Sequence, residues 1–450
     1  MMRWIARVYA PERWRVLAVQ ELWTGMARMY VRKTLPNGLR LVTAPISHVR
    51  SVSIALFFGV GSRYEPDEIA GVSHFIEHMV FKGSKRFPTA QVISETIEGV
   101  GGLLNASTDR ETTVYTARIA SRYFEQAMEL LADMVRHPLF AADEIARERR
   151  VISEEIGMYM DDPGSWVSVL ANELFWLDTP LGREIAGTRE TVQGMPDFAV
   201  REYHARHYLP NNLVISVAGD VTPEQVEEVA ARLLGDWTSQ PAPVWTPCPP
   251  HEAAPHVRLD TRETEQTNFD LLLLGLSYTD PDRYALSLLN TMLGDSMSSR
   301  LFLEVRERLG LAYDVGSALI QYHDTGAFSI SAGVAPEQAG EALAAILREV
   351  ARVRDEPVTP EELARAKEYT RGRITLSQEN TGAVSGWYGA QELDLGQIRE
   401  LDEELDLYDA VTREDIQRVA ERIFREESLR LALIGPHEDS APFEALLRLP

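Results

Sequence analysis

Alternation of apolar and polar residues begins at Tyr30 and predicts β-strands along much of the chain. The stretch VRKTLPNGLRLVTAP alternates on both sides of a Pro-Asn-Gly sequence at 36–38, as in a β-hairpin with a tight turn. Further strands are expected within residues 51–66, 103–119 and 212–221. A period of 3.6 residues predicts helices over residues 71–82 (with Gly83 as the cap), 121–136 and 142–160, and after Thr222-Pro223-Glu224.

The order of elements recurs beyond a proline-rich break. Residues 236–255 hold many prolines and no periodicity, whereas strands are expected again in 256–278 and 312–334, with a helix over 281–293. Two helices and a strand at 427–436 follow. We therefore predict an α+β fold of two homologous halves, each a mostly antiparallel sheet packed with helices. The expected divisions are an N-terminal extension (1–29), a first half (30–236), a linker (237–257) and a second half (258–450).

Composition narrows the possible functions. The 450 residues carry a net charge of −23, which disfavours nucleic acid as a partner. The single cysteine, Cys248, excludes a disulfide framework and a cysteine-rich zinc cluster. No apolar run approaches the roughly 18–20 residues that span a bilayer. The Arg-rich extension is compatible with a targeting or membrane-surface helix but is better explained as dispensable, and we expect a cytoplasmic protein.

The predicted helix at 71–82 contains His74-Phe75-Ile76-Glu77-His78. Residues four apart lie on one helix face, so both imidazoles can reach one metal ion, and Glu77 lies near enough to act as a general base. A chance H-x-x-E-H on a surface helix is the alternative. The apolar residues around the motif argue against a solvated helix.

A catalytic zinc site needs a third protein ligand. On the predicted helix at 142–160, Glu148, Ile152 and Glu155 share a face. One carboxylate could therefore bind the metal while the other orients a ligand. From spacing alone, ordinary solvated acids would be the simpler explanation.

The order His74-x-x-Glu77-His78, followed after 76 residues by Glu155 in ERRVISEEIG, resembles the inverted zinc motif of pitrilysin-type (insulinase-family) metallopeptidases. The resemblance runs from about Tyr30 to the C-terminus, through blocks such as GSRYEP, GGLLNASTDRETTVYTA and SMSSRLFLEVRERLGLAYDV. It is nearest to the branch of the mitochondrial processing peptidase β-subunit and its bacterial relatives.

This resemblance implies a role for each matching residue. Glu155, rather than its neighbour Glu154, is the implied third ligand, and Glu148 a supporting acid. Asn105 and Ala106 lie on the strand that, in such enzymes, pairs with the substrate backbone. No histidine marks a second metal site in the second half, so one zinc ion per chain is expected.

Arg306 and Tyr313 match a pair that, in the family, completes the site from the second half and hydrogen-bonds the scissile carbonyl. The expected function is therefore a zinc-dependent endopeptidase that hydrolyses unstructured peptides or presequence-like segments in a closed chamber, with a preference for basic peptides. Four α+β units form that chamber in the family, so we expect a homodimer, with a heterodimer containing an inactive homologue as the alternative. The competing functions are a non-catalytic structural subunit of a larger complex and a zinc amidohydrolase of small molecules.

Overall fold

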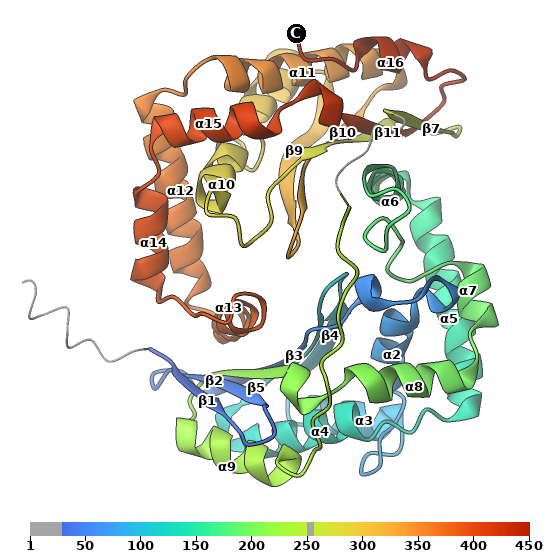
Figure 1. The fold of residues 1–450 in the computed structure, drawn as a ribbon, viewed down its shortest axis with the longest axis vertical. Helices are drawn as coiled ribbons and strands as arrows, with labels where there is room; N and C mark the ends of the chain where they lie inside the picture. The colour runs from blue at the N-terminus through green and yellow to red at the C-terminus, as the bar shows by residue number, and fades with distance from the viewer. Residues whose placement is uncertain (1–28, 250–255) are drawn as a thin grey trace, which may run out of the picture.

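The computed structural model describes residues 29–249 and 256–450, which form two β-sheets with helices around each (Figure 1). The predicted N-terminal extension lies outside the described residues except for Met29, and so does the 250–255 portion of the predicted linker. Within the linker, residues 237–249 form neither helix nor strand.

The first sheet has six strands in the order β1-β2-β6-β3-β5-β4. All neighbours are antiparallel except the parallel pair β2–β6. The predicted hairpin is β1 and β2, with Thr34 opposite Arg40, and Gly38 supplies the positive φ of 85° that its turn requires. The strands are β1 (Val31–Thr34), β2 (Arg40–Pro45), β3 (Ser51–Phe58), β4 (Leu103–Thr108), β5 (Thr113–Ala120) and β6 (Leu213–Gly219).

The second sheet repeats this topology without the first edge strand. Its order is β7-β11-β8-β10-β9, and its only parallel pair in the described chain is β7–β11. Matching the two orders places β9 where β4 lies in the first half, at a free sheet edge. The strands are β7 (Val257–Thr261), β8 (Thr267–Leu274), β9 (Ala312–Gln321), β10 (Gly326–Val334) and β11 (Arg430–Gly435). The α+β fold of two homologous halves is therefore confirmed.

Helices pack against both sheets. In the first half they are α2 (Val72–Val80), α3 (Ala90–Glu98), α4 (Phe124–Arg136), α5 (Ala142–Asp161), α6 (Pro163–Phe175), α7 (Arg189–Gly194), α8 (Asp197–His207) and α9 (Pro223–Leu234). In the second half they are α10 (Arg283–Leu293), α11 (Ala339–Asp355), α12 (Pro360–Ser377), α13 (Thr381–Asp394), α14 (Leu401–Asp409), α15 (Arg413–Ile423) and α16 (Ala441–Leu446). None of the described helices is long and apolar enough to cross a membrane.

Each half places one helix on the other half's sheet (Figure 1). Helix α6, from the first half, packs on β8 and β11, where Leu170 and Phe175 share a buried cluster with Leu272 and Ile434. Helix α13, from the second half, packs in the same way on β3 and β6. Each sheet is therefore covered in part by a helix that comes from the other half of the sequence.

Two local expectations were wrong. The sequence predicted two helices between β10 and β11, but five are present, α11 to α15. Gly83 does not cap the first predicted helix, because α2 ends at Val80 with Phe81 as its cap residue. Gly83 instead has a φ of 141° in the following turn, where a side chain would collide with the Pro88 carbonyl.

Candidate metal centre and active site

Helix α2 presents two histidines on one face and buries the other. Phe75, Ile76 and Met79 are fully buried in the first core, which fixes the rotation of the helix about its axis. His74 and His78 consequently lie together, with ring centroids 4.6 Å apart. The predicted pairing of the two imidazoles is therefore present.

A buried acid holds the start of α2. Gly71 N and Ser73 N donate to the two carboxylate oxygens of Glu65, at 2.7 and 2.8 Å. Glu65 thereby supplies acceptors for amides that the first turn of a helix leaves without a main-chain partner. Burial raises the pKa of Glu65 to about 7, against these hydrogen bonds. Sequence reasoning missed this residue, since GSRYEP indicated only a turn.

Glu155 of α5 completes a three-residue cluster. One ligand atom each from His74, His78 and Glu155 lies within 4.8 Å of the others. Glu155 Oε2 is 3.8 Å from His74 Nε2 and 3.5 Å from His78 Nε2. Among the residues that the structure describes, this is the only group of three or more potential metal ligands. We call His74, His78 and Glu155 the ligand triad.

The chemistry of the triad fits a zinc ion. Two imidazole nitrogens and one carboxylate oxygen are a donor set of catalytic zinc sites, which keep a fourth position open. Burial and the neighbouring His78 lower the pKa of His74 to about 4. His74 is therefore neutral at physiological pH, which is the form that coordinates a metal.

Glu148 orients one of these ligands. Its side chain is only 1% exposed, and one of its oxygens lies 2.9 Å from His78 Nδ1, which turns Nε2 toward Glu155. Its other oxygen pairs with Lys82 Nζ at 2.6 Å. Although burial opposes ionisation, these two contacts lower the pKa of Glu148. A carboxylate behind a ligating histidine fixes the ring and strengthens its basicity.

Glu77 lies between the histidines in sequence and is held by β4. Thr108, the last residue of that strand, donates its hydroxyl to Glu77 Oε2 at 2.6 Å. Burial and the charge of Glu155 raise the pKa of Glu77, while the Thr108 hydrogen bond opposes the shift. Sequence reasoning missed Thr108, because nothing in a strand threonine signals a partner on a helix.

Strand β4 forms the free edge of the first sheet. It pairs only with β5 among the described strands, so its outer edge can accept another extended chain. Both residues predicted to contact substrate lie on it. The Ala106 amide donates to the Asn105 side chain at 2.9 Å, in an exposed contact that a substrate strand could replace.

Among the described residues, Arg306 and Tyr313 lie together and make no contact with the triad. The Arg306 guanidinium is 5.2 Å from the centre of the Tyr313 ring, and Tyr313 is 77% exposed. Within 29–249 and 256–450, neither side chain hydrogen-bonds, ion-pairs or stacks with Glu77 or the triad. Arg306 belongs to a π-helical segment, η5 (Phe302–Arg308).

Comparison with known proteins places this architecture in a family. The insulinase profile (peptidase family M16) matches residues 40–189, and that of the peptidase M16 inactive domain matches residues 199–369. An uncharacterised zinc protease of Streptomyces coelicolor is 36% identical over 414 residues, 91% of this chain and 90% of the relative. The uncharacterised zinc protease YmxG of Bacillus subtilis is 36% identical over 408 residues, 91% of this chain and 98% of the relative.

Solved structures share the fold. A protease from Helicobacter pylori superimposes with a TM-score of 0.82 at 21% identity, covering 90% of this chain and 99% of that one. A peptidase M16 inactive domain from Pseudomonas fluorescens superimposes with a TM-score of 0.84 at 22% identity, covering 91% and 98%. The sequence matches at 36% identity along nearly the whole chain show that the protein belongs to the insulinase family of peptidases, peptidase family M16.

Proposed function

We propose that this chain is a zinc-dependent endopeptidase that hydrolyses unstructured peptides. The observation that carries the proposal is the convergence of His74, His78 and Glu155 beside the partly buried carboxylate of Glu77. The names of the related zinc proteases support the choice of metal. A non-catalytic structural subunit would have no need of an intact ligand set with a supporting acid.

The triad, Glu77 and strand β4 each have a separate role in the proposed reaction. The triad would hold a zinc ion, which would supply Lewis acidity to water and to the scissile carbonyl. Glu77 accepts a proton from the attacking water and passes it to the leaving amine. The raised pKa of Glu77 brings the carboxyl group nearer to the range in which both transfers are efficient at neutral pH. Strand β4 aligns the substrate through main-chain hydrogen bonds at Asn105 and Ala106.

Cleavage of an unstructured peptide by wild type and by Glu77→Gln tests this function. Wild type should cleave, lose activity to a chelator and regain it with zinc, whereas Glu77→Gln should bind zinc equally and lose at least about 10²-fold in kcat. Equal cleavage by two zinc-loaded proteins would contradict the mechanism. Absence of both zinc and cleavage would favour the structural subunit, and turnover of small amides alone would favour an amidohydrolase.

We also propose that the enzyme works as a homodimer in which two copies enclose the substrate. The triad has no contact with Arg306 or Tyr313 in the described chain, so its oxyanion-binding side is incomplete in a single copy. A second copy that presents this pair to the triad would supply both hydrogen-bond donors.

The acidic character of the protein suggests its substrates. Part of the net charge of −23 would line an enclosed chamber and attract extended, basic peptides. We expect kcat/KM for Arg- or Lys-containing peptides to fall as ionic strength rises. Rates that are indifferent to both peptide charge and salt would contradict this preference.

A further inference from the structure

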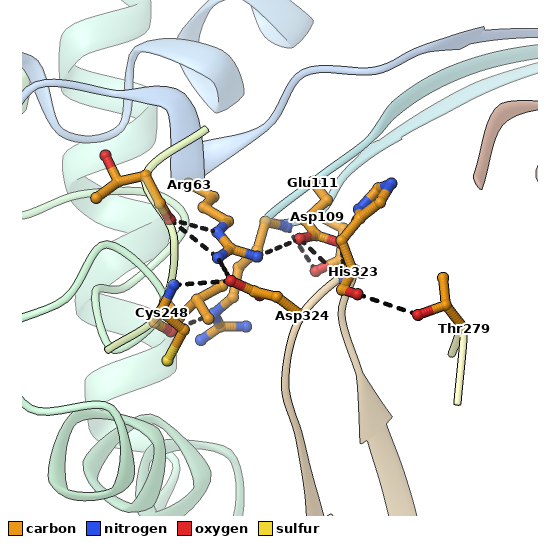
Figure 2. A network of polar contacts seen from close by, with 10 residues as sticks. Arg63, Asp109, Glu111, Cys248, Thr279, His323 and Asp324 are labelled. Atoms are coloured by element: carbon orange, nitrogen blue, oxygen red, sulfur yellow. Dashed lines mark hydrogen bonds and ion pairs between the residues drawn. The ribbon is translucent and has the colours of Figure 1, made fainter. Parts of the chain in front are cut away.

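A buried arginine joins the two halves and the linker at one point. Arg63 follows β3, and its side chain is fully buried. Its guanidinium contacts Glu111 Oε1 at 2.5 Å and Asp324 Oδ2 at 2.8 Å, and it donates to the Thr246 carbonyl at 2.9 Å (Figure 2). We call Arg63, Glu111, Thr246, His323 and Asp324 the Arg63 clasp.

Glu111 is shared between the halves. It lies in the turn between β4 and β5, and its first oxygen binds Arg63. Its second oxygen lies 3.1 Å from the main-chain nitrogen of His323 and 2.8 Å from His323 Nδ1 (Figure 2). His323 and Asp324 form the tip of the β9–β10 hairpin, so the second half is anchored to the β4–β5 turn of the first.

The linker closes the clasp from another side. The Cys248 amide donates to Asp324 Oδ2 at 2.8 Å, and the Trp245 ring lies 4.1 Å from the Arg63 guanidinium carbon. Every charged group of the clasp therefore has a partner on another segment. Buried charges that are fully paired hold a fixed geometry, because removing one partner leaves the other charge buried and unpaired, which is costly in free energy.

The anchored turn adjoins the proposed general base. Thr108, whose hydroxyl holds Glu77, lies three residues before Glu111. The main chain is fixed as well, because Arg63 N donates to Arg110 O at 2.8 Å. Only glycine fits at Gly61, since a Cβ there would lie 2.0 Å from the Asp109 carbonyl oxygen.

We propose that the Arg63 clasp is a positioning device for the general base: the hairpin tip of the second half, acting through Glu111, holds the turn that places Thr108 against Glu77. The proposal rests on the endopeptidase function proposed above. It gives a role to the second half, which carries none of the triad residues: its hairpin tip supports the position of the Glu77 carboxylate, the proposed carrier of the proton. Thr108, Glu111, His323 and Asp324 are positioning residues in this scheme, and none of them needs to touch the substrate.

A double-mutant cycle between Glu111→Gln and Thr108→Val tests the proposal. Each substitution keeps the side-chain shape, and Asp324 still partners Arg63 after the change at Glu111. Each single variant should lower kcat roughly 10-fold or more with KM nearly unchanged and zinc stoichiometry intact. The double variant should be no slower than the worse single variant, because both changes disturb the same contact with Glu77. Thr108→Ser should recover most of the activity.

Glu362→Gln is the matched control. Glu362 makes a two-pronged, largely buried ion pair with Arg300, at 2.7 and 2.8 Å, within the second half. This variant should keep wild-type kcat even where its melting temperature falls. The proposal would be wrong, and the clasp only structural, if Glu111→Gln kept wild-type kcat as the control does. The same holds if the fall in kcat of the double variant equalled the product of the two single falls.

Amide hydrogen exchange separates failure of the clasp from failure of the proposed function. In Glu111→Gln, exchange should rise in residues 103–116 while β3 and β6 stay protected. If wild type cleaves no peptide, the endopeptidase function fails, but the anchoring of the turn is still judged by exchange. Unchanged protection of residues 103–116 in Glu111→Gln would show that Glu111 does not anchor the turn and would overturn the proposal. Should Glu111→Gln not fold, Asp324→Asn, which loosens the tip from Arg63, takes its place in the cycle.

Discussion

Three acids near α2 contact different groups, and two of them, Glu65 and Glu148, are buried, whereas Glu77 is partly buried. Glu65 accepts two main-chain amides at the start of the helix, Glu77 accepts the Thr108 hydroxyl, and Glu148 contacts His78 and Lys82. Each carboxylate therefore contacts a different part of the site: Glu65 the start of α2, Glu77 the end of β4, and Glu148 the proposed metal ligand His78.

Glu148→Gln should weaken zinc binding roughly 10- to 100-fold, because it removes the carboxylate behind His78 while leaving the triad intact. Competition with a chromophoric chelator measures this affinity. Glu154→Gln is the matched control, since Glu154 is exposed and precedes the ligand Glu155. A larger loss for Glu154→Gln than for Glu148→Gln would contradict the assignment of both α5 acids.

Glu65 should make the protein less stable as pH rises. Its pKa is about 7 in the folded chain against 4.5 when exposed, so the folded state holds the extra proton between these values. Its stabilising contribution is full below pH 4.5 and is lost as pH rises through 7, by roughly 3 kcal/mol. In metal-free protein, Glu65→Gln should flatten the fall in unfolding free energy between pH 5 and 7. An unchanged slope in denaturant titrations would contradict this.

Helical spacing identified His74, His78 and Glu77 as one cluster, and the family resemblance then selected Glu155 as the third ligand and Glu148 as the supporting acid. The sequence did not predict Glu65 or Thr108. The partners of Glu65 lie 6 and 8 positions away at the start of α2, and the partner of Thr108 lies 31 positions away on that helix. The Glu65 contacts need the loop before α2 to fold back, and the Thr108 contact exists only once α2 packs beside β4. Residue patterns report local periodicity, whereas these roles depend on tertiary packing.

At the level of elements, the strands and the helices α2, α4, α5, α9 and α10 were predicted, whereas α3, α6, α7 and α8 were not. The exchange of α6 and α13 between the sheets was not predicted. An apolar helix face indicates that the helix is buried but does not identify the sheet that buries it. The π-helical η5 was also missed, because its sequence has ordinary helical periodicity.

Leu170→Ala on α6 should therefore destabilise the second sheet, although Leu170 belongs to the first half of the sequence. Its buried side chain packs with Leu272 and Ile434, and its loss should cost about 2–5 kcal/mol. Hydrogen exchange should report lost protection in β8 and β11. Leu234→Ala on α9 is the matched control, since that helix packs on β2 of the first sheet and the substitution should expose β2 instead. Identical exchange patterns in the two variants would contradict the cross-packing.

At the level of the whole molecule, the Arg63 clasp bears on how Tyr313 reaches a zinc site. Tyr313 lies near the start of β9, and the anchored hairpin tip follows the end of that strand. An extended strand from Tyr313 to the end of β9 is about 27 Å long. The tip is held beside the turn that carries Glu111, close to Thr108 and Glu77. Bringing Tyr313 to the triad of its own chain would require release of this anchor, so a second copy is the better source of the pair.

Mixing two inactive variants distinguishes these sources. Glu77→Gln lacks the general base and Tyr313→Phe lacks a donor to the oxyanion, so each homodimer should be slow. After subunit exchange, half of the dimers contain one of each chain. If the pair acts across the dimer, one site in each mixed dimer has both Glu77 and Tyr313. Activity should then recover to about a quarter of wild type. Recovery should track the mixed-dimer fraction measured by native mass spectrometry. No recovery despite mixed dimers would show that each chain completes its own site, and the anchored hairpin would then have to move during turnover.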